Sequence, residues 1–403
     1  MSAATSTPPD SAARRALAPR RFAGVAPERR VASRTKARRT VRRTASPAAP
    51  ASRGAVAKAR ALPVEGVPID MVTIADPEAL SVQGQLVADA LVAELEAQAR
   101  RAARSGYEGC AGLAHHERYP SMPQWLALRG SGLALHSLHH PSYATRLAHG
   151  FGFDAFLRPL FDGESAVDAL RALLGPERAA RVIDRHRVFC ETPMSDEARL
   201  LMGGAIDPRA IRQRALLATH ALVARGGRFG AGTRIAAVGA GTGDTVAQIA
   251  AGLGAGRLTL IDRDPMALAA ATVITGRRVP GLDVEATLAH RGLVAELAAA
   301  GSFDIVDLTA ALDTLPDGAA VELLRTARRA LGPGGVVVAA NMLDRRPQQT
   351  LLDRVLRWPA LTQRSAAELA RLAGAAGFAA RQISLAIPAT APVYAVATID
   401  TAA

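Results

Sequence analysis

The sequence predicts an α/β fold with an open, mostly parallel sheet, because a strand, a glycine-rich turn and a helix follow one another in mid-chain. Arg234–Val238 is a short apolar run of the length of a buried strand. Three glycines follow at alternate positions, Gly239, Gly241 and Gly243, and a helix is expected to run from there through Ile249. Glycine lets the chain turn sharply and lets a ligand lie against bare backbone, so this turn is a candidate binding loop.

The start of that helix adds to the prediction. Thr242, Asp244 or Thr245 is expected to cap it, since a side-chain oxygen there can accept a hydrogen bond from a free backbone N–H. A helix N-terminus also carries a partial positive charge, which suits a carboxylate or another anion.

A second strand is predicted at Arg257–Ile261, with Asp262 at its C-terminal end, 19 positions after Gly243. A carboxylate there can accept both ribose hydroxyls of an adenosine. Dinucleotide sites prefer G-x-G-x-x-G, whereas Asp244 occupies the sixth position here and the spacing is G-x-G-x-G. The pattern predicts a nucleoside site, and an NAD(P)-dependent oxidoreductase is an alternative.

The glycine loop with Asp262 resembles motifs I and II of class I S-adenosylmethionine-dependent methyltransferases. Other segments agree with this family in order along Arg209–Thr398: Phe303–Leu308 resembles its fourth strand, Leu331–Gly335 the turn into its fifth strand at Val336–Ala340, and Ala373–Phe378 with the two strand-like runs after it the terminal antiparallel hairpin.

The resemblance implies a Rossmann-like sheet, S-adenosyl-L-methionine as cofactor, and methyl transfer to a small-molecule acceptor. The cofactor-binding residues that it implies are Gly239, Ala240, Gly241, Gly243, Asp262, Arg263 and Asp307. Asp307, Thr309 and Asp313 are expected near the C-terminal edge of the sheet, but none is assigned as a catalytic base.

Two positions depart from the family's pattern. The acid that commonly stands two positions before the first glycine, where it bonds the methionine amino group, is Ala237 here. The acid that commonly follows the third strand and bonds the adenine is also missing, and His290 is the nearest polar side chain. A non-catalytic binding module with the same fold is therefore a further alternative.

Three features slightly narrow the range of possible methyl acceptors: the segment Asp307–Asp317, the residue Asn341 and the segment Leu352–Trp358. They resemble bacterial enzymes that methylate 3-hydroxy fatty acids at the carboxyl, which implies a carboxylate or hydroxyl of a lipid or secondary metabolite. A helix is also expected from Asp207, and its arginines could hold an anionic acceptor or form a charged solvent face. Arg209 and Arg212 share one face of it, and Arg214 points elsewhere.

The 403 residues divide into three predicted parts: a disordered Arg-rich tail at 1–62, a mainly helical domain at 63–206 that serves as acceptor lid or pocket, and the methyltransferase domain at 207–403. Within the helical part, residues 63–75 are expected to be an extended connector and a helix to begin at Asp76–Pro77. Further helices are expected at 125–135, 143–149 and 166–174.

The positive charge is concentrated in the tail. Residues 1–62 hold 15 of the 49 basic residues and 2 of the 36 acidic ones, so the rest of the chain has 34 of each. By charge alone the tail could bind nucleic acid or an anionic membrane, and its composition also fits a transit peptide. A solvated tail without a partner is the favoured interpretation.

The remaining composition points to no metal and no disulfide framework. Six histidines gather at 115–149, yet they fit no compact ligand motif, and Cys110 and Cys190 are the only cysteines. The sequence has no apolar run of 18 residues and no hydrophobic signal-peptide core, which predicts a cytoplasmic protein. Nothing in it indicates the oligomeric state.

Overall fold

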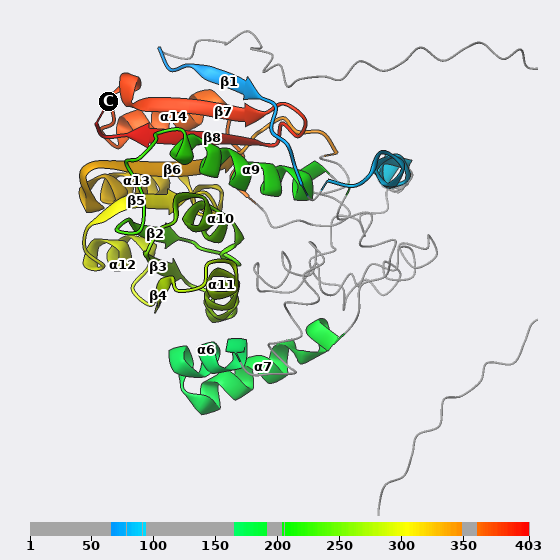
Figure 1. The fold of residues 1–403 in the computed structure, drawn as a ribbon, viewed down its shortest axis with the longest axis vertical. Helices are drawn as coiled ribbons and strands as arrows, with labels where there is room; N and C mark the ends of the chain where they lie inside the picture. The colour runs from blue at the N-terminus through cyan, green and yellow to red at the C-terminus, as the bar shows by residue number, and fades with distance from the viewer. Residues whose placement is uncertain are drawn as a thin grey trace, which may run out of the picture. The chain divides into compact units, whose positions relative to one another are not determined.

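The computed structural model describes residues 66–77, 79–90, 92–93, 165–191, 204, 206–348 and 361–402 (Figure 1). All of them belong to one compact unit, Ala55–Ala403. Several predictions fall outside the described residues: the tail at 1–62, the helices at 125–135 and 143–149, the six histidines at 115–149, and the segment Leu352–Trp358.

The centre of the fold is an eight-stranded sheet in the order β1-β7-β8-β6-β5-β2-β3-β4. The strands are β1 (Ile69–Val72), β2 (Arg234–Val238), β3 (Arg257–Asp262), β4 (Asp283–Leu288), β5 (Phe303–Leu308), β6 (Leu331–Met342), β7 (Ile383–Pro388) and β8 (Tyr394–Asp400). β8 runs antiparallel to both of its neighbours, and the other described pairs are parallel. The predicted Rossmann-like sheet with a C-terminal antiparallel hairpin is confirmed.

Helices cover both faces of this sheet (Figure 1). The described helices are α6 (Ser165–Leu174), α7 (Pro176–Glu191), α9 (Ile206–Val223), α10 (Asp244–Leu253), α11 (Pro265–Arg278), α12 (Leu293–Ala299), α13 (Asp317–Ala330) and α14 (Ala366–Ala375), with short 3₁₀ turns η3 (Leu312–Thr314) and η5 (Ala380–Gln382). In β2, Ile235 and Ala237 pack toward α9 and α10, while Ala236 and Val238 pack toward α12 and α13. Burial on both faces explains why this strand is a continuous apolar run.

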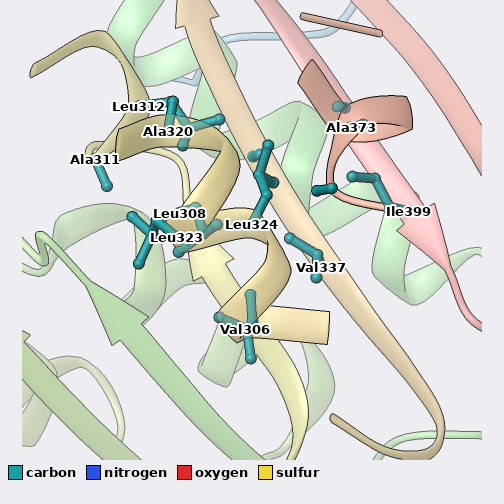
Figure 2. Close-up of a cluster of buried hydrophobic side chains, with 14 of the residues drawn as sticks. Val306, Leu308, Ala311, Leu312, Ala320, Leu323, Leu324, Val337, Ala373 and Ile399 are labelled. Atoms are coloured by element: carbon teal, nitrogen blue, oxygen red, sulfur yellow. The ribbon is translucent and has the colours of Figure 1, made fainter. Parts of the chain in front are cut away.

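The core on the second face joins α13 and α14 to the middle of the sheet. Figure 2 shows Leu323 and Leu324 of α13 beside Leu308 of β5 and Val337 of β6. Ala373 of α14 belongs to the same cluster. This packing fixes β5 and β6, whose C-terminal ends carry polar side chains of the site.

Two predictions for the N-terminal segment were wrong. Residues 69–72, expected in a connector, form β1 and pair with β7 from Ile69 opposite Leu385 to Val72 opposite Pro388. The sheet edge supplies the backbone partners that make so short a run a strand. The helix expected at Asp76–Pro77 begins at residue 82, and the Asp76 carboxylate pairs with Arg212.

The helix predicted at 166–174 is confirmed as α6, and it packs against α11 through a small apolar cluster that includes Leu170 and Val273. β1 shows that part of the segment 63–206 completes the sheet of the following domain; the division at residues 62 and 206 otherwise stays a prediction. None of the described helices combines the length and the hydrophobicity that a membrane span requires.

Candidate functional site

The candidate site lies where four neighbouring strands end. β4, β3, β2 and β5 are adjacent and parallel, so their C-terminal ends meet at one edge of the sheet. This edge carries the glycine loop after β2, Asp262 at the end of β3 and Asp307 near the end of β5. In open α/β sheets, the crevice at this edge is where ligands bind.

The three glycines of the loop have left-handed backbone conformations for different reasons. A Cβ at Gly239 would lie 3.1 Å from the Ala311 side chain, and one at Gly243 would lie 2.8 Å from the Ala271 Cα, so both positions serve close packing. A Cβ at Gly241 would have nothing within 4 Å. Bare backbone with open space beside it is what a ligand lying against the loop requires.

Asp262 is directly joined to this loop. Its Oδ2 accepts a hydrogen bond of 2.9 Å from the Gly241 N–H, and its Oδ1 accepts one of 2.9 Å from the Asp264 N–H. Burial raises the pKa of the Asp262 carboxyl, and these backbone hydrogen bonds oppose that rise. Each oxygen of an ionised carboxylate can accept a further hydrogen bond, so the pair of ribose hydroxyls predicted for it can still be bound.

The expected caps of α10 are not formed. The N-cap residue is Gly243, without a side-chain cap bond, so none of Thr242, Asp244 and Thr245 caps the helix. Asp244 pairs with Arg278 at 2.8 Å instead. The helix N-terminus therefore keeps free N–H groups facing the loop, which favours an anion or a polar ligand group there. The capping Asp of the next helix is Asp264, two positions after Asp262.

A cavity opens to solvent beside the loop. Its lining includes Gly239, Ala240, Gly241, Thr242, Asp307, Thr309, Arg212 and Arg214. Asp307 is 5% exposed, and its Oδ1 accepts a hydrogen bond of 2.9 Å from the Thr309 N–H. Burial raises the pKa of Asp307, while the hydrogen bonds from Thr309 and the charge of Arg214 lower it.

The arginine side chains of α9 do not point in the directions that were predicted. Arg212 and Arg214 line the same cavity, although Arg214 was predicted to point away from the face that Arg209 and Arg212 share. Arg212 pairs with Asp76 at 3.1 Å, and Arg214 is buried. The long side chains reach one cavity from different sides of the helix, which residue spacing alone does not reveal.

A second cavity, of about 340 Å³, lies at the ends of β3 and β4. Arg263 and His290 line it together with residues of α6 and α7: Leu174, Arg178, Arg181 and Val182. Of the predicted binding residues, Gly239, Ala240, Gly241 and Asp307 line the first cavity and Arg263 lines the second, whereas Gly243 and Asp262 line neither of the two.

Behind the first cavity, a buried polar group joins the loop after β5 to the end of β6. Arg364, which is 3% exposed, donates hydrogen bonds to the Leu312 carbonyl at 2.9 Å, the Leu315 carbonyl at 2.7 Å and the Asn341 Oδ1 at 2.6 Å. It also bonds Asp317 at 2.9 Å. Sequence reasoning singled out Asp317 and Asn341 but missed Arg364, since one arginine before a helix gives no signal.

Asp313 lies beside this group and does not line either cavity. It is 2% exposed, and its Oδ2 has no hydrogen-bond partner among the residues that the structure describes. Burial raises the pKa of Asp313 from 3.8 to about 6, against the opposing charges of Arg214 and Arg364. An acid with a raised pKa in the folded state destabilises the fold wherever it is ionised.

Asp313→Asn is therefore expected to raise the free energy of unfolding by about 1–3 kcal/mol at pH 8. The gain should shrink as pH falls through 6 and be lost near pH 4, because the wild-type carboxyl is then protonated in both states. Chemical denaturation at several pH values measures it, with the exposed Asp344→Asn as control. A loss of stability at pH 8, or a gain that is the same at every pH, would contradict the assignment.

Residues 235–335 match the model of a protein family described as a methyltransferase domain. By this match, the segment is a methyltransferase domain. The matched segment of this domain runs from β2 into β6 and includes the glycine loop, Asp262 and Asp307. No curated protein matches the chain.

The methyltransferase domain also has partial structural likenesses. A protein described as a possible exported protein from Bordetella parapertussis has 18% sequence identity and a TM-score of 0.43, with 65% of this chain and 97% of that chain covered. Magnesium protoporphyrin IX methyltransferase from Synechocystis PCC 6803 has 15% identity and a TM-score of 0.39, with 55% of this chain and 94% of that chain covered. The identification rests on the family match, not on these likenesses.

Proposed function

We propose that the methyltransferase transfers the methyl group of S-adenosylmethionine to an oxygen of a small-molecule acceptor. The observation that carries the proposal is the hydrogen bond from the Gly241 N–H to the Asp262 carboxylate. It joins a bare-backbone loop to an acid on the next strand, at the edge where a nucleoside can lie against both.

The chain's own residues fit such a cofactor in three places. The carboxylate of Asp262 would accept the ribose hydroxyls, and the open backbone at Gly241 would admit the ligand close to the loop. The cavity lined by Arg263 and His290, beside the end of β3, would take the adenine. The cavity lined by Ala240 and Asp307 would take the methionine part.

When bound, S-adenosylmethionine supplies an electrophilic methyl group on a sulfonium, so the protein mainly needs to hold the acceptor oxygen in line with it. The Synechocystis protein to which this chain is similar is a magnesium protoporphyrin IX methyltransferase with bound S-adenosylhomocysteine. Its name gives a small molecule as the acceptor. A hydroxyl or carboxylate of a lipid or secondary metabolite is the acceptor proposed here. The predicted cytoplasmic location stays a prediction.

Isothermal titration with S-adenosylhomocysteine and with NAD tests the cofactor. We expect binding of the first and none of the second. Binding of NAD alone would replace the proposal with an oxidoreductase, and binding of neither would favour the non-catalytic module.

Asp262→Asn is expected to weaken S-adenosylhomocysteine binding about 10- to 100-fold, because the ribose hydroxyls lose a charged acceptor worth about 1.5–3 kcal/mol. The side-chain amide would also face a backbone N–H with a donor in place of an acceptor. Asp283→Asn, an exposed acid at the opposite edge of the sheet, serves as control and should bind normally. Equal affinities of the two variants for S-adenosylhomocysteine would show that Asp262 does not contact the ligand.

A further inference from the structure

The second cavity is lined by apolar and basic residues only. Arg178 and Arg181 come from α7, Arg263 follows β3, and His290 lies just after β4. None of the nine lining residues is acidic. Arg178 and Arg181 are three positions apart, so they lie on the same face of α7. Positive charges that border one cavity repel each other, and an anionic group placed between them would replace this repulsion with attraction.

The acids close to this cavity along the chain are already engaged. Asp262 and Asp264 stand on either side of the arginine that follows β3, and each carboxylate accepts hydrogen bonds of 2.9 Å from backbone N–H groups. Glu296, whose charge also acts on His290, pairs with Arg291 at 2.7 Å. Among the residues that the structure describes, none of these acids pairs with an arginine that lines the cavity.

The three arginines therefore keep their hydrogen-bond donors for a ligand. In the described part of the chain, the side chains of Arg178, Arg181 and Arg263 form no hydrogen bond and no ion pair. Glu177 lies next to Arg178 and one turn before Arg181 on α7, but it pairs with neither of them. All three arginines are exposed, so a ligand can reach them from solvent. A guanidinium is a planar fork of N–H donors, which fits the oxygens of a phosphate.

The rest of the lining suits an organic group. It includes Leu174, Val182, Leu288 and Ala289, and the volume of about 340 Å³ lies in the range of small-molecule sites. A phosphate monoester carries up to about two negative charges and a carboxylate only one, so a phosphate matches three guanidinium groups better. We propose that this cavity binds a small organic phosphate, whose phosphate group contacts Arg178, Arg181 and Arg263.

Such a ligand would also control access of the cofactor. Arg263 and His290 line the place proposed for the adenine, so a bound organic phosphate and the adenosine part of the cofactor exclude each other. Only this exclusion rests on the proposed function; the binding of the phosphate does not. Small organic phosphates are then competitive inhibitors with respect to S-adenosylmethionine.

Isothermal titration with phenyl phosphate, at constant pH and ionic strength, tests the site. We expect the double variant Arg178→Gln/Arg181→Gln to bind it about 10- to 100-fold more weakly than the wild type, because the charge-assisted hydrogen bonds of two guanidinium groups are lost. Inorganic phosphate and benzoate should bind the wild type more weakly than phenyl phosphate does. The first lacks the apolar group, and the second carries less charge.

The matched control is Arg171→Gln/Arg277→Gln, which removes the same charge from exposed positions on α6 and α11 that line neither cavity. It should bind phenyl phosphate within about twofold of the wild type. Arg178→Lys/Arg181→Lys keeps the charge without the planar fork, so its affinity should be intermediate. Melting temperatures verify that each variant is folded.

Competition with S-adenosylhomocysteine tests the exclusion. With phenyl phosphate at about ten times its Kd, the apparent Kd of the wild type for S-adenosylhomocysteine should rise about tenfold. The same concentration of phenyl phosphate should change that Kd by no more than about twofold in Arg178→Gln/Arg181→Gln, because this variant leaves most of the cavity open to the cofactor.

Three results would overturn the phosphate site. The first is wild-type affinity for phenyl phosphate in a folded Arg178→Gln/Arg181→Gln variant, and the second is an equal loss of affinity in the control variant Arg171→Gln/Arg277→Gln. The third is a short single-stranded oligonucleotide that binds more tightly than phenyl phosphate and depends on the same two arginines of α7, which would assign the site to a nucleic-acid backbone.

The exclusion and the proposed function have outcomes of their own. Simultaneous binding of phenyl phosphate and S-adenosylhomocysteine with unchanged affinities would overturn the exclusion. Failure of the wild type to bind S-adenosylhomocysteine would overturn the proposed function, while the titration with phenyl phosphate alone would still decide the phosphate site.

Discussion

Arg364→Met is expected to lower the free energy of unfolding by about 3–5 kcal/mol, because it removes the charged member of a buried hydrogen-bonded group. The methionine side chain fills similar space but donates nothing. The carbonyls of Leu312 and Leu315 and the side-chain oxygen of Asn341 would each lose a donor. Buried acceptors without partners cost about 1–3 kcal/mol each, and partial relaxation or entry of water would limit the sum.

The removal of Arg364 should also disturb the first cavity. Arg364 ties the turn η3 to the end of β6, and this turn follows the residues Asp307 and Thr309 that line the first cavity. Chemical denaturation measures the stability, with Arg325→Met as control. Arg325 pairs with Glu322 on the surface, where both side chains are 43% exposed, so its loss should cost less than about 1 kcal/mol. Similar losses for the two variants would show that burial of Arg364 contributes little.

Gly243→Ala is expected to cost about 2–5 kcal/mol of stability. The residue has φ 75°, a conformation that costs an L-amino acid about 1–2 kcal/mol. The new methyl group would also lie 2.7 Å from the Ala271 Cβ and 2.8 Å from its Cα, so α11 would have to move away from the loop. Overpacking of this kind costs about 1–3 kcal/mol more.

Gly241→Ala is the matched control, because it has the same kind of backbone strain without the contact. Its φ is 57°, and a Cβ there would have nothing within 4 Å. In thermal or chemical denaturation, the free energy of unfolding of Gly241→Ala should therefore be about 1–3 kcal/mol higher than that of Gly243→Ala. Equal stabilities would mean that α11 can move away from the new methyl group at no energetic cost. Glycine would then be required at position 243 only for its positive φ.

The central strands and the two main binding elements could be predicted from the sequence. The strand bounds Arg234–Val238 and Phe303–Leu308 agree with the structure because buried parallel strands are apolar on both faces and end at polar residues. The spacing of the glycine loop and Asp262 was informative for a similar reason, since one helix and one strand necessarily separate neighbouring strand ends. The cofactor roles of these residues stay predictions.

The sequence alone therefore determined the α/β class, the positions of the central strands along the chain and the glycine loop between two of them, since all of these follow from local periodicity. Only the tertiary structure decided that β1 joins the sheet, that Arg364 is a buried donor, and that Arg214 shares a cavity with Asp307. These features depend on pairing between residues far apart in the chain. The elements packed around an arginine decide whether it is exposed, paired or buried beside a cavity. Its neighbours in the sequence do not indicate which elements these are.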